Sequence, residues 1–372
     1  MPPDRRTSSG RRVVRVVLSS VHCWPDVRRG GERYVHELAA ALSRAGHDVR
    51  VLSTGTAPRR DSVLGVPVHR LPVRHLRRFG ELDVEAAFGL QALAHLGGPA
   101  ALGRYDVWHA TSTADGAAAA LLGRTGRVRS VFTDHGFPAR ASRERRPDHA
   151  LHRYVVEHVD AYVCVSASAG SYLSSDFGRE AAVVPPGVRL ADHAPAVRDP
   201  RPTLLYAGSL VESRKGVPLL VEAAAELRAE VPDLQLWLLG QGDATEVLRG
   251  APDGLVTRRE LADDGALRDA YARAWVTVLP SVAESFGMTV VESLASGTPV
   301  VVRADGGGPA EIVDRPEVGR LSGPTASDLA RACGEALELA GRASTPDACR
   351  ERARDFDWDA AVVPALTAVY AG

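Results

Sequence analysis

Short apolar runs alternate with segments of helical period along the whole chain. The run Val13–Leu18 predicts a first strand, and Glu32–Ala45 carries apolar residues at helical spacing until Gly46 ends the pattern. Such alternation is typical of parallel sheets covered by helices. Further strands are expected in this half at Val49–Leu52, Val66–Leu71, Val107–Ala110, Val128–Phe132, Ala161–Val165 and Ala182–Val184.

A change of pattern follows at Pro185–Pro202, which is rich in proline and charge and lacks a period, as a linker would. A second series of strands and helices begins directly after it. Its expected strands are Thr203–Ala207, Leu234–Leu239, Gly254–Thr257, Trp275–Leu279 and Pro299–Val302, and its helices include Pro218–Glu230 and Ala266–Ala274. A last helix is expected over Asp357–Tyr370.

These patterns predict an α/β protein with two Rossmann-like doubly wound domains facing across a cleft, and a C-terminal helix that returns to the N-terminal domain. Open α/β sheets bind ligands beyond the carboxyl ends of their strands. Two α/β domains with separate purposes remain the alternative. The expected bounds are a loose basic tail at 1–12, a first domain at 13–187, a linker at 188–202, a second domain at 203–355 and the last helix at 356–372.

Composition narrows the function classes. The 372 residues are 45% hydrophobic and 24% charged with a net charge of −1, so no overall field attracts nucleic acid or membrane. Cys23, Cys164, Cys333 and Cys349 are too widely spaced to suggest a zinc site or a disulfide framework. No apolar stretch approaches the roughly 20 residues of a membrane span, and no secretory signal is recognised. We therefore expect a cytoplasmic protein that holds any anion locally.

One cation resists the arginine-rich composition. Lysine and arginine together number 45, yet Lys215 is the only lysine in the chain. It lies beside Gly216, shortly after an expected strand. A compact ammonium at such a place suits a phosphate group.

Two glutamates flank an expected helix start. Glu284 precedes it and Glu292 lies about two turns further, which separates the carboxylates by ~12 Å. The first backbone N–H groups of a helix lack helical partners and favour anions. The two carboxylates and the anion site between them match the ribose, diphosphate and hexose of a nucleotide sugar, whereas a solvated helix is the alternative. The residues at this helix start are Phe286, Gly287, Met288 and Thr289.

The run Glu284–Val301, followed by Gly306–Glu311, resembles the E-x7-E, A-x-G-x-P-V-V and G-G-x-x-E motifs of retaining glycosyltransferases of family 4. The resemblance implies a GT-B fold with an acceptor-side N-terminal domain and a C-terminal domain that binds a nucleotide-diphosphate sugar. It implies that Glu284 binds hydroxyls of the donor sugar and that Glu292 binds the ribose. Transfer to an acceptor hydroxyl with retention of anomeric configuration is then expected.

The N-terminal half extends the resemblance. Gly30 and Gly31 before Tyr34 are similar to a family signature, and a glycine pair lets the backbone approach the diphosphate. His109 and His135 each lie at the carboxyl end of an expected strand, where a histidine is often only a structural hydrogen-bonding residue. Both are nevertheless assigned to the acceptor side, and the Thr-x-His-Gly context of His135 resembles the active-site histidine of the family.

The phosphate clamp departs from the family pattern. Ser209 stands where the resemblance implies an arginine, so either Arg214 compensates or Lys215 holds the diphosphate alone. The catalytic residues predicted are His135, Lys215 and Glu284. Thr257, Glu260 and Leu261 are expected near the base, and a second departure puts Pro186 and Arg189 where the family commonly has Asn and Asp.

No Asp-x-Asp pair follows a strand, so we expect no metal and no cofactor beyond the sugar donor. The expected partners are that donor and an unidentified acceptor, a small molecule or a glycan, and no nucleic acid. Basic runs at Arg74–Phe79 and Arg140–Arg146 could meet lipid headgroups, although solvated loops are favoured. A dinucleotide-dependent oxidoreductase is disfavoured, because it would need G-x-G-x-x-G after the first strand and Ser19–Gly31 lacks this motif. A sugar-nucleotide epimerase of the same fold and a non-catalytic nucleotide-sugar-binding protein remain alternatives.

Overall fold

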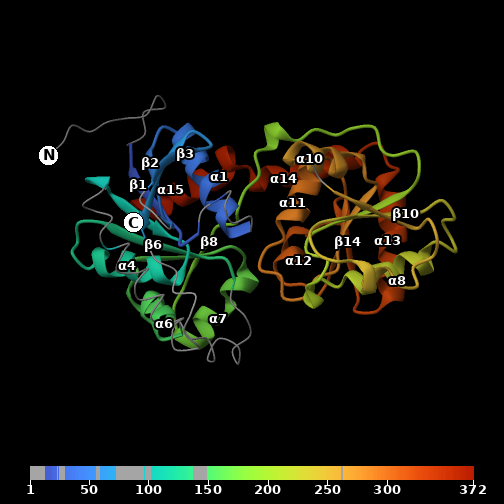
Figure 1. The fold of residues 1–372 in the computed structure, drawn as a ribbon, viewed down its shortest axis with the longest axis horizontal. Coiled ribbons are helices and arrows are strands. Elements are labelled where there is room, and N and C mark those ends of the chain that lie inside the picture. The colour runs from blue at the N-terminus through green and yellow to red at the C-terminus, as the bar shows by residue number, and fades with distance from the viewer. Residues whose placement is uncertain are drawn as a thin grey trace. The chain divides into compact units, whose positions relative to one another are not determined.

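The chain divides into two compact units (Figure 1). The computed structural model describes residues 13–22, 24, 30–55, 59–72, 96, 102–136, 149–260 and 263–372. The N-terminal unit comprises Met1–Pro186 with Trp358–Gly372, and the C-terminal unit comprises Gly187–Asp357. Two doubly wound α/β units are therefore confirmed, and the last helix belongs to the N-terminal unit as expected.

The N-terminal unit is built on an eight-stranded sheet of order β3-β4-β2-β1-β5-β6-β7-β8. Neighbouring strands are parallel except for β3 and β4, which are antiparallel. Apolar β-branched residues fill the central strands because both faces of such a sheet are covered. The strands are β1 (Arg15–Ser19), β2 (Asp48–Gly55), β3 (Arg59–Val63), β4 (Val66–Pro72), β5 (Val107–Ala110), β6 (Arg129–Asp134), β7 (Ala161–Cys164) and β8 (Ala182–Val183).

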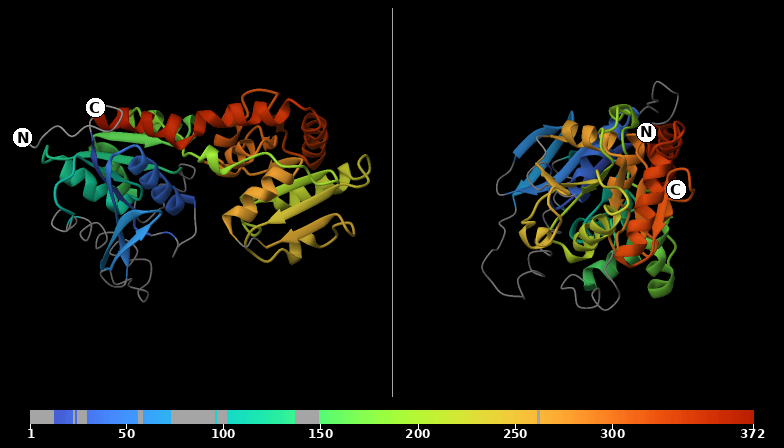
Figure 2. Two further views of the ribbon diagram at one scale, coloured as in Figure 1. Left: turned by 90° about the horizontal axis from the view of Figure 1, so that it is seen from above. Right: turned by 90° about the vertical axis from the view of Figure 1, so that its right-hand side faces the viewer.

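Each face of this sheet has its own apolar core. Val16 and Leu18 of β1 point into a core shared with α1 and α15, whereas Val17 points into a core shared with α4, α6 and α7. The C-terminal helix thus completes one face of the N-terminal unit, where Figure 2 shows it in red. The helices are α1 (Gly30–Arg44), α4 (Thr113–Gly123), α6 (His149–His158), α7 (Ala167–Phe177), the π-helical turn η4 (Trp358–Val362) and α15 (Val363–Ala371).

The edge strand β3 is absent from the sequence prediction. It pairs with β4 across a two-residue turn in which Leu64 has φ 50° and Gly65 has φ 81°. Two successive positive φ values are typical of the tight hairpin turn that matches strand twist. The strand itself is mostly exposed and polar, so it lacks the apolar run by which the other strands were recognised.

The C-terminal unit carries a six-stranded parallel sheet of order β11-β10-β9-β12-β13-β14. The chain reverses its direction of winding beside the central strand β9, and ligands of such sheets bind at this point. The strands are β9 (Thr203–Ala207), β10 (Gln235–Leu239), β11 (Val256–Arg259), β12 (Val276–Leu279), β13 (Val300–Arg303) and β14 (Gly319–Ser322), the last of which was not predicted.

Helices and short turns cover this second sheet. A helix α13 packs against both α8 and β14 (Figure 1). The longer helices are α8 (Val217–Leu227), α10 (Asp264–Arg273), α11 (Met288–Ala295), α13 (Ala326–Ala340) and α14 (Thr345–Ala353). The short ones are η1 (Leu190–Asp192), η2 (Ser213–Lys215), α9 (Thr245–Leu248), α12 (Gly308–Ile312) and η3 (Arg354–Phe356).

The described cysteines are structural residues of the apolar cores. Within the described part of the chain, Cys164, Cys333 and Cys349 are buried and free, and burial raises the pKa of the Cys333 and Cys349 thiols to about 12. They are therefore unreactive at neutral pH.

Among the described residues, no helix combines the length and apolar character that crossing a membrane requires.

Candidate active site

Three loops meet beyond the carboxyl ends of β9, β12 and β13. Backbone hydrogen bonds join them: Val282 N donates to Arg214 O over 2.9 Å, Glu284 N donates to Gly306 O over 2.9 Å, and Gly308 N donates to Glu284 O over 2.9 Å. These bonds bring together the predicted phosphate clamp and the first glutamate of the predicted pair.

Lys215 and Arg214 converge on one carboxylate oxygen. Lys215 Nζ lies 2.5 Å from Glu284 Oε2, and Arg214 Nη1 lies 3.1 Å from the same oxygen. Arg214 also pairs with Glu212, at 3.0 Å between Nη2 and Oε2. Side-chain exposure is 14% for Lys215 and 17% for Glu284, against 44% for Arg214. Three predicted donor-site residues therefore form one partly buried ion cluster, in which Arg214 is the most exposed member.

The backbone around Lys215 fixes its position. Lys215 ends the turn η2, and the next residue, Gly216, has φ 67°. A Cβ at Gly216 would lie 2.6 Å from Pro280 O, so no other residue fits without a shift. Glycine is thus required where the β9 loop passes the end of β12.

Ser209 is held by its backbone. Tyr206 Oη donates to Ser209 O over 2.8 Å. The pKa of Tyr206 is raised, mainly by burial and to a smaller extent by the nearby negative charges of Glu284 and Glu212. The Tyr206 hydroxyl therefore stays protonated at neutral pH and can donate this hydrogen bond. Arg214 reaches the same Glu284 carboxylate as Lys215, and compensation by Arg214 for the cation missing from position 209 stays a prediction.

Helix α11 begins at a second strained glycine. Gly287 has φ 93°, and a Cβ there would lie 2.9 Å from Pro309 Cγ. Met288 and Thr289 follow as the first helical residues, so their N–H groups are placed at the anion-favouring end of the helix. The Phe286 side chain is buried edge-on against Phe356, with ring centroids 5.6 Å apart, which leaves only its backbone for a ligand.

Glu292 is a buried carboxylate with a defined partner. Its side chain is 5% exposed, and Tyr271 Oη from α10 donates to Glu292 Oε2 over 3.0 Å. Tyr271 is itself fully buried in an apolar cluster with Trp237 and Leu239. Tyr271 was missed at the sequence level, because only the packing of α10 on α11 brings the two side chains together.

The expected base region lies at the end of β11. Thr257 is in that strand and Glu260 follows it, while Leu261 falls outside the described residues. Between them, the Arg259 guanidinium lies 3.5 Å from the centroid of the Trp237 ring. Arg259 was also missed at the sequence level. It pairs with Leu239 on the neighbouring strand β10, and Leu239 lies two residues beyond Trp237. This register places the side chains of Arg259 and Trp237 on the same face of the sheet.

In the N-terminal unit, Gly30 and Gly31 begin α1. A Cβ on Gly30 would meet nothing within 4 Å, and one on Gly31 would come no closer than 3.9 Å to His135 Cδ2. Packing within the described residues therefore does not require glycine at either position. A role in approaching a ligand stays a prediction.

His135 is half-buried, and its imidazole is neutral at neutral pH. Burial lowers its pKa to about 4, and its Nε2 atom is buried with no hydrogen-bond partner among the described residues. Its ring lies edge-on to Tyr34, with centroids 4.5 Å apart. The preceding Asp134 holds the loop, since Oδ1 accepts from Gly136 N over 2.9 Å and Oδ2 accepts from Tyr172 Oη over 2.5 Å.

His109 has a different environment from the predicted one. It is fully buried, Nδ1 lies 2.7 Å from Tyr370 Oη, and Nε2 lies 2.6 Å from Thr133 Oγ1. Both ring nitrogens are therefore used in joining β5, β6 and α15. The structural interpretation that the sequence left open is favoured, and we leave His109 out of the proposed acceptor side.

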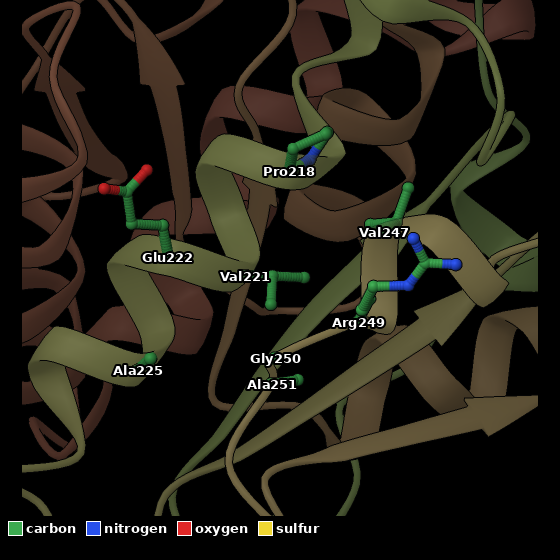
Figure 3. Close-up of a pocket in the computed structure, with 8 residues that line it drawn as sticks. All are labelled: Pro218, Val221, Glu222, Ala225, Val247, Arg249, Gly250 and Ala251. Atoms are coloured by element: carbon green, nitrogen blue, oxygen red, sulfur yellow. The ribbon is translucent and has the colours of Figure 1, made fainter.

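A separate hollow of about 440 Å³ lies between α8 and the segment after α9 (Figure 3). Its lining is mainly apolar and includes none of the predicted site residues. We therefore assign no function to this hollow. Over the described stretches, no group of three or more His, Cys, Asp or Glu side chains is arranged to hold a metal ion.

Solved structures of the same architecture identify the fold. The chain is similar to the structure of sucrose-phosphate synthase from Thermosynechococcus elongatus, with a TM-score of 0.80, 24% identity, and coverage of 96% of this chain and 98% of that one. It is also similar to an Anabaena protein in complex with UDP-glucose, with a TM-score of 0.71, 16% identity, and coverage of 96% and 100%. The fold is that of the GT-B glycosyltransferases.

The family follows from sequence comparison. Residues 28–192 match Glycosyltransferase Family 4, and residues 201–338 match Glycosyl transferases group 1. A D-inositol 3-phosphate glycosyltransferase from Xylanimonas cellulosilytica is 30% identical over 421 residues, covering 97% of each protein. The chain belongs to glycosyltransferase family 4 and is a glycosyltransferase.

Proposed function

We propose that the protein transfers a sugar from a nucleotide-diphosphate sugar to an acceptor hydroxyl, with retention of anomeric configuration and without a metal. The observation that carries the proposal is the convergence of Lys215 and Arg214 at the carboxyl ends of β9 and β12. Two cations beside a helix start can hold a diphosphate. The Anabaena protein of the same fold, which binds UDP-glucose, supports this donor class.

The donor then lies along the loops of the C-terminal unit. Lys215, Arg214 and the first N–H groups of α11 hold the diphosphate, together with the backbone around Ser209. Glu292, fixed by Tyr271, accepts from ribose hydroxyls, and Glu284 accepts from hydroxyls of the transferred sugar. The base lies near the end of β11, at Thr257, Glu260 and Leu261.

In the proposed reaction the acceptor hydroxyl attacks the anomeric carbon from the face that the diphosphate leaves. The bond between that carbon and the phosphate oxygen breaks, the new glycosidic bond forms, and the hydroxyl proton passes to a leaving phosphate oxygen. Lys215 and Arg214 stabilise the charge that develops on the diphosphate, which is the largest contribution expected of such a site. Glu284 is engaged by both cations and serves as a sugar ligand, not as a nucleophile.

The acceptor is assigned to the N-terminal unit, where His135 is the candidate contact. A neutral imidazole can orient a hydroxyl without attracting a charge, which fits an uncharged sugar or alcohol group. We propose a small molecule or a glycan as the acceptor. The D-inositol 3-phosphate named for the Xylanimonas relative is one candidate to be tested.

The test is a panel of nucleotide sugars, screened for binding by thermal shift and then for release of nucleoside diphosphate with candidate acceptors. Activity that survives EDTA and a product of retained configuration by NMR are the expected results. An inverted product would refute retention, and loss of activity in EDTA would refute metal independence. Turnover of donor without acceptor would favour an epimerase, whereas binding without any turnover would favour a nucleotide-sugar-binding protein.

A further inference from the structure

The Glu284 carboxylate binds two cations that could instead bind a ligand anion. Its Oε2 atom accepts from Lys215 Nζ at 2.5 Å and from Arg214 Nη1 at 3.1 Å, and these are the distances at which a phosphate oxygen would be bound. The same two cations are those proposed to hold the diphosphate. A bound diphosphate and the carboxylate therefore compete for one pair of cations.

The charges of this cluster balance before a ligand arrives. Arg214 and Lys215 supply two positive charges, and Glu212 and Glu284 supply two negative charges. A diphosphate that takes the cations leaves the partly buried Glu284 carboxylate without its partners. An uncompensated carboxylate in such a place is costly, and hydroxyl donors can remove much of that cost.

The exchange must be made by side chains, because the backbone is fixed. Glu284 is tied to Gly306 and Gly308 by hydrogen bonds of 2.9 Å each, and a Cβ at Gly307 would lie 2.7 Å from Glu284 O. Lys215 is fixed by the close approach of Gly216 to the β12 end. The carboxylate can therefore turn away from the cations but cannot leave the site with its loop.

We propose that Glu284 is a specificity-determining residue that acts as an internal counter-anion and favours nucleotide sugars over free nucleoside diphosphates. Both ligands displace the Glu284 carboxylate from the cations. The sugar hydroxyls of a nucleotide sugar then donate hydrogen bonds to this carboxylate, whereas a nucleoside diphosphate has no sugar at that place and leaves it unpaired. The inference rests on the proposed donor class. It implies that the protein resists occupation by its own diphosphate product.

The test compares Glu284→Gln with the wild type in calorimetric titrations of UDP, ADP, GDP, inorganic pyrophosphate and the matching nucleotide sugars. The variant keeps the shape and the hydroxyl contacts but removes the competing charge. Affinity for the free diphosphates should rise by about tenfold, since a charge-assisted contact no longer has to be broken. Affinity for the nucleotide sugar should change less, so the preference for the sugar-bearing form falls.

A matched control is Glu335→Gln. Glu335 on α13 also lies between two cations, at 2.7 Å from Arg331 Nη1 and 3.2 Å from Arg320 Nε, and it is outside the predicted site. This variant should leave the preference unchanged. In a Lys215→Ala background, the gain caused by Glu284→Gln should shrink, because the two side chains act on each other.

An unchanged preference in Glu284→Gln, or equal weakening of both ligand types, would overturn the inference while leaving the donor class intact. Glu284→Ala provides a second variant with the same expectation for free diphosphates, and thermal melting shows that each variant is folded. If the wild type binds neither nucleotide sugars nor nucleoside diphosphates, the proposed function fails and the inference fails with it.

Discussion

The two units carry different polar chemistry at the carboxyl ends of their sheets. In the C-terminal unit, Arg214, Lys215 and Glu284 are charged, partly exposed and paired with one another. In the N-terminal unit, His109 is fully buried and His135 is half-buried, and desolvation lowers the pKa of each imidazole, to about 3 and about 4. The first arrangement can exchange partners with an anion, whereas the second keeps neutral groups in fixed positions. This contrast suits a charged donor on one unit and a hydroxyl acceptor on the other.

Removing the lysine is expected to have the largest effect on this contrast. Lys215→Ala should lower turnover at saturating donor by roughly two to three orders of magnitude, because leaving-group stabilisation is lost. The measurement is kcat by release of nucleoside diphosphate. Arg331→Ala, at an exposed ion pair of α13, is the control. Near-normal turnover in Lys215→Ala would contradict the clamp.

Removing the hydroxyl that fixes Glu292 should affect donor binding instead. Tyr271→Phe should raise the donor KM by about tenfold with little change in kcat, since one hydrogen bond to a charged group is lost. Tyr154→Phe is the control, because the Tyr154 hydroxyl oxygen is buried and makes no hydrogen bond within the part of the chain that the structure describes. A fall in kcat with an unchanged KM would show that Glu292 does not bind the donor ground state.

The buried imidazole of His109 predicts a pH dependence of the free energy of unfolding. Burial lowers the folded pKa of His109 to about 3, so the unfolded chain takes up a proton near pH 6.5 and the folded chain does not. This contribution is present above about pH 6.5 and is lost as the pH falls toward the folded pKa. In urea titrations, His109→Gln should reduce the slope of unfolding free energy against pH by up to ~1.4 kcal/mol per pH unit. An unchanged slope between pH 6 and 4.5 would contradict the burial of a neutral His109.

Restoring the family arginine is expected to have the smallest effect. Ser209→Arg should lower the donor KM only about twofold in the wild type, since Arg214 already supplies a second cation. In an Arg214→Ala background the same change should lower it severalfold. Equal gains in both backgrounds would show that Arg214 does not take the place of the missing arginine.

Much of the fold could be predicted because buried parallel strands have apolar runs. The edge strands β3 and β14 were missed, since their sequences RRDSV and GRLS are short and partly polar. Their pairing is decided by the hairpin turn at Leu64 and Gly65 and by the neighbouring strand, and neither leaves an apolar pattern.

For the candidate site, the sequence predicted that certain residues would lie close together, but not which contacts they make. Motif spacing located Lys215 and Glu284, and parallel topology placed both loops at one edge of the sheet. The contact of Arg214 and Lys215 with one oxygen of Glu284 depends on the strained turn at Gly216, which no motif spacing shows. The structural role of His109 depends on Tyr370, 261 residues away, so no local pattern could distinguish it from a site histidine.

The return of the last segment to the N-terminal unit has a consequence for biosynthesis. Trp358, Val362 and Leu366 are buried in the same core as β1 and α1, and Arg129 Nε donates to Val369 O over 2.9 Å. During translation this segment leaves the ribosome only after all of Gly187–Asp357 has been made. The apolar face of the N-terminal sheet that packs against the last segment therefore stays uncovered while the C-terminal unit is synthesised. The unit that is begun first is the one that is finished last.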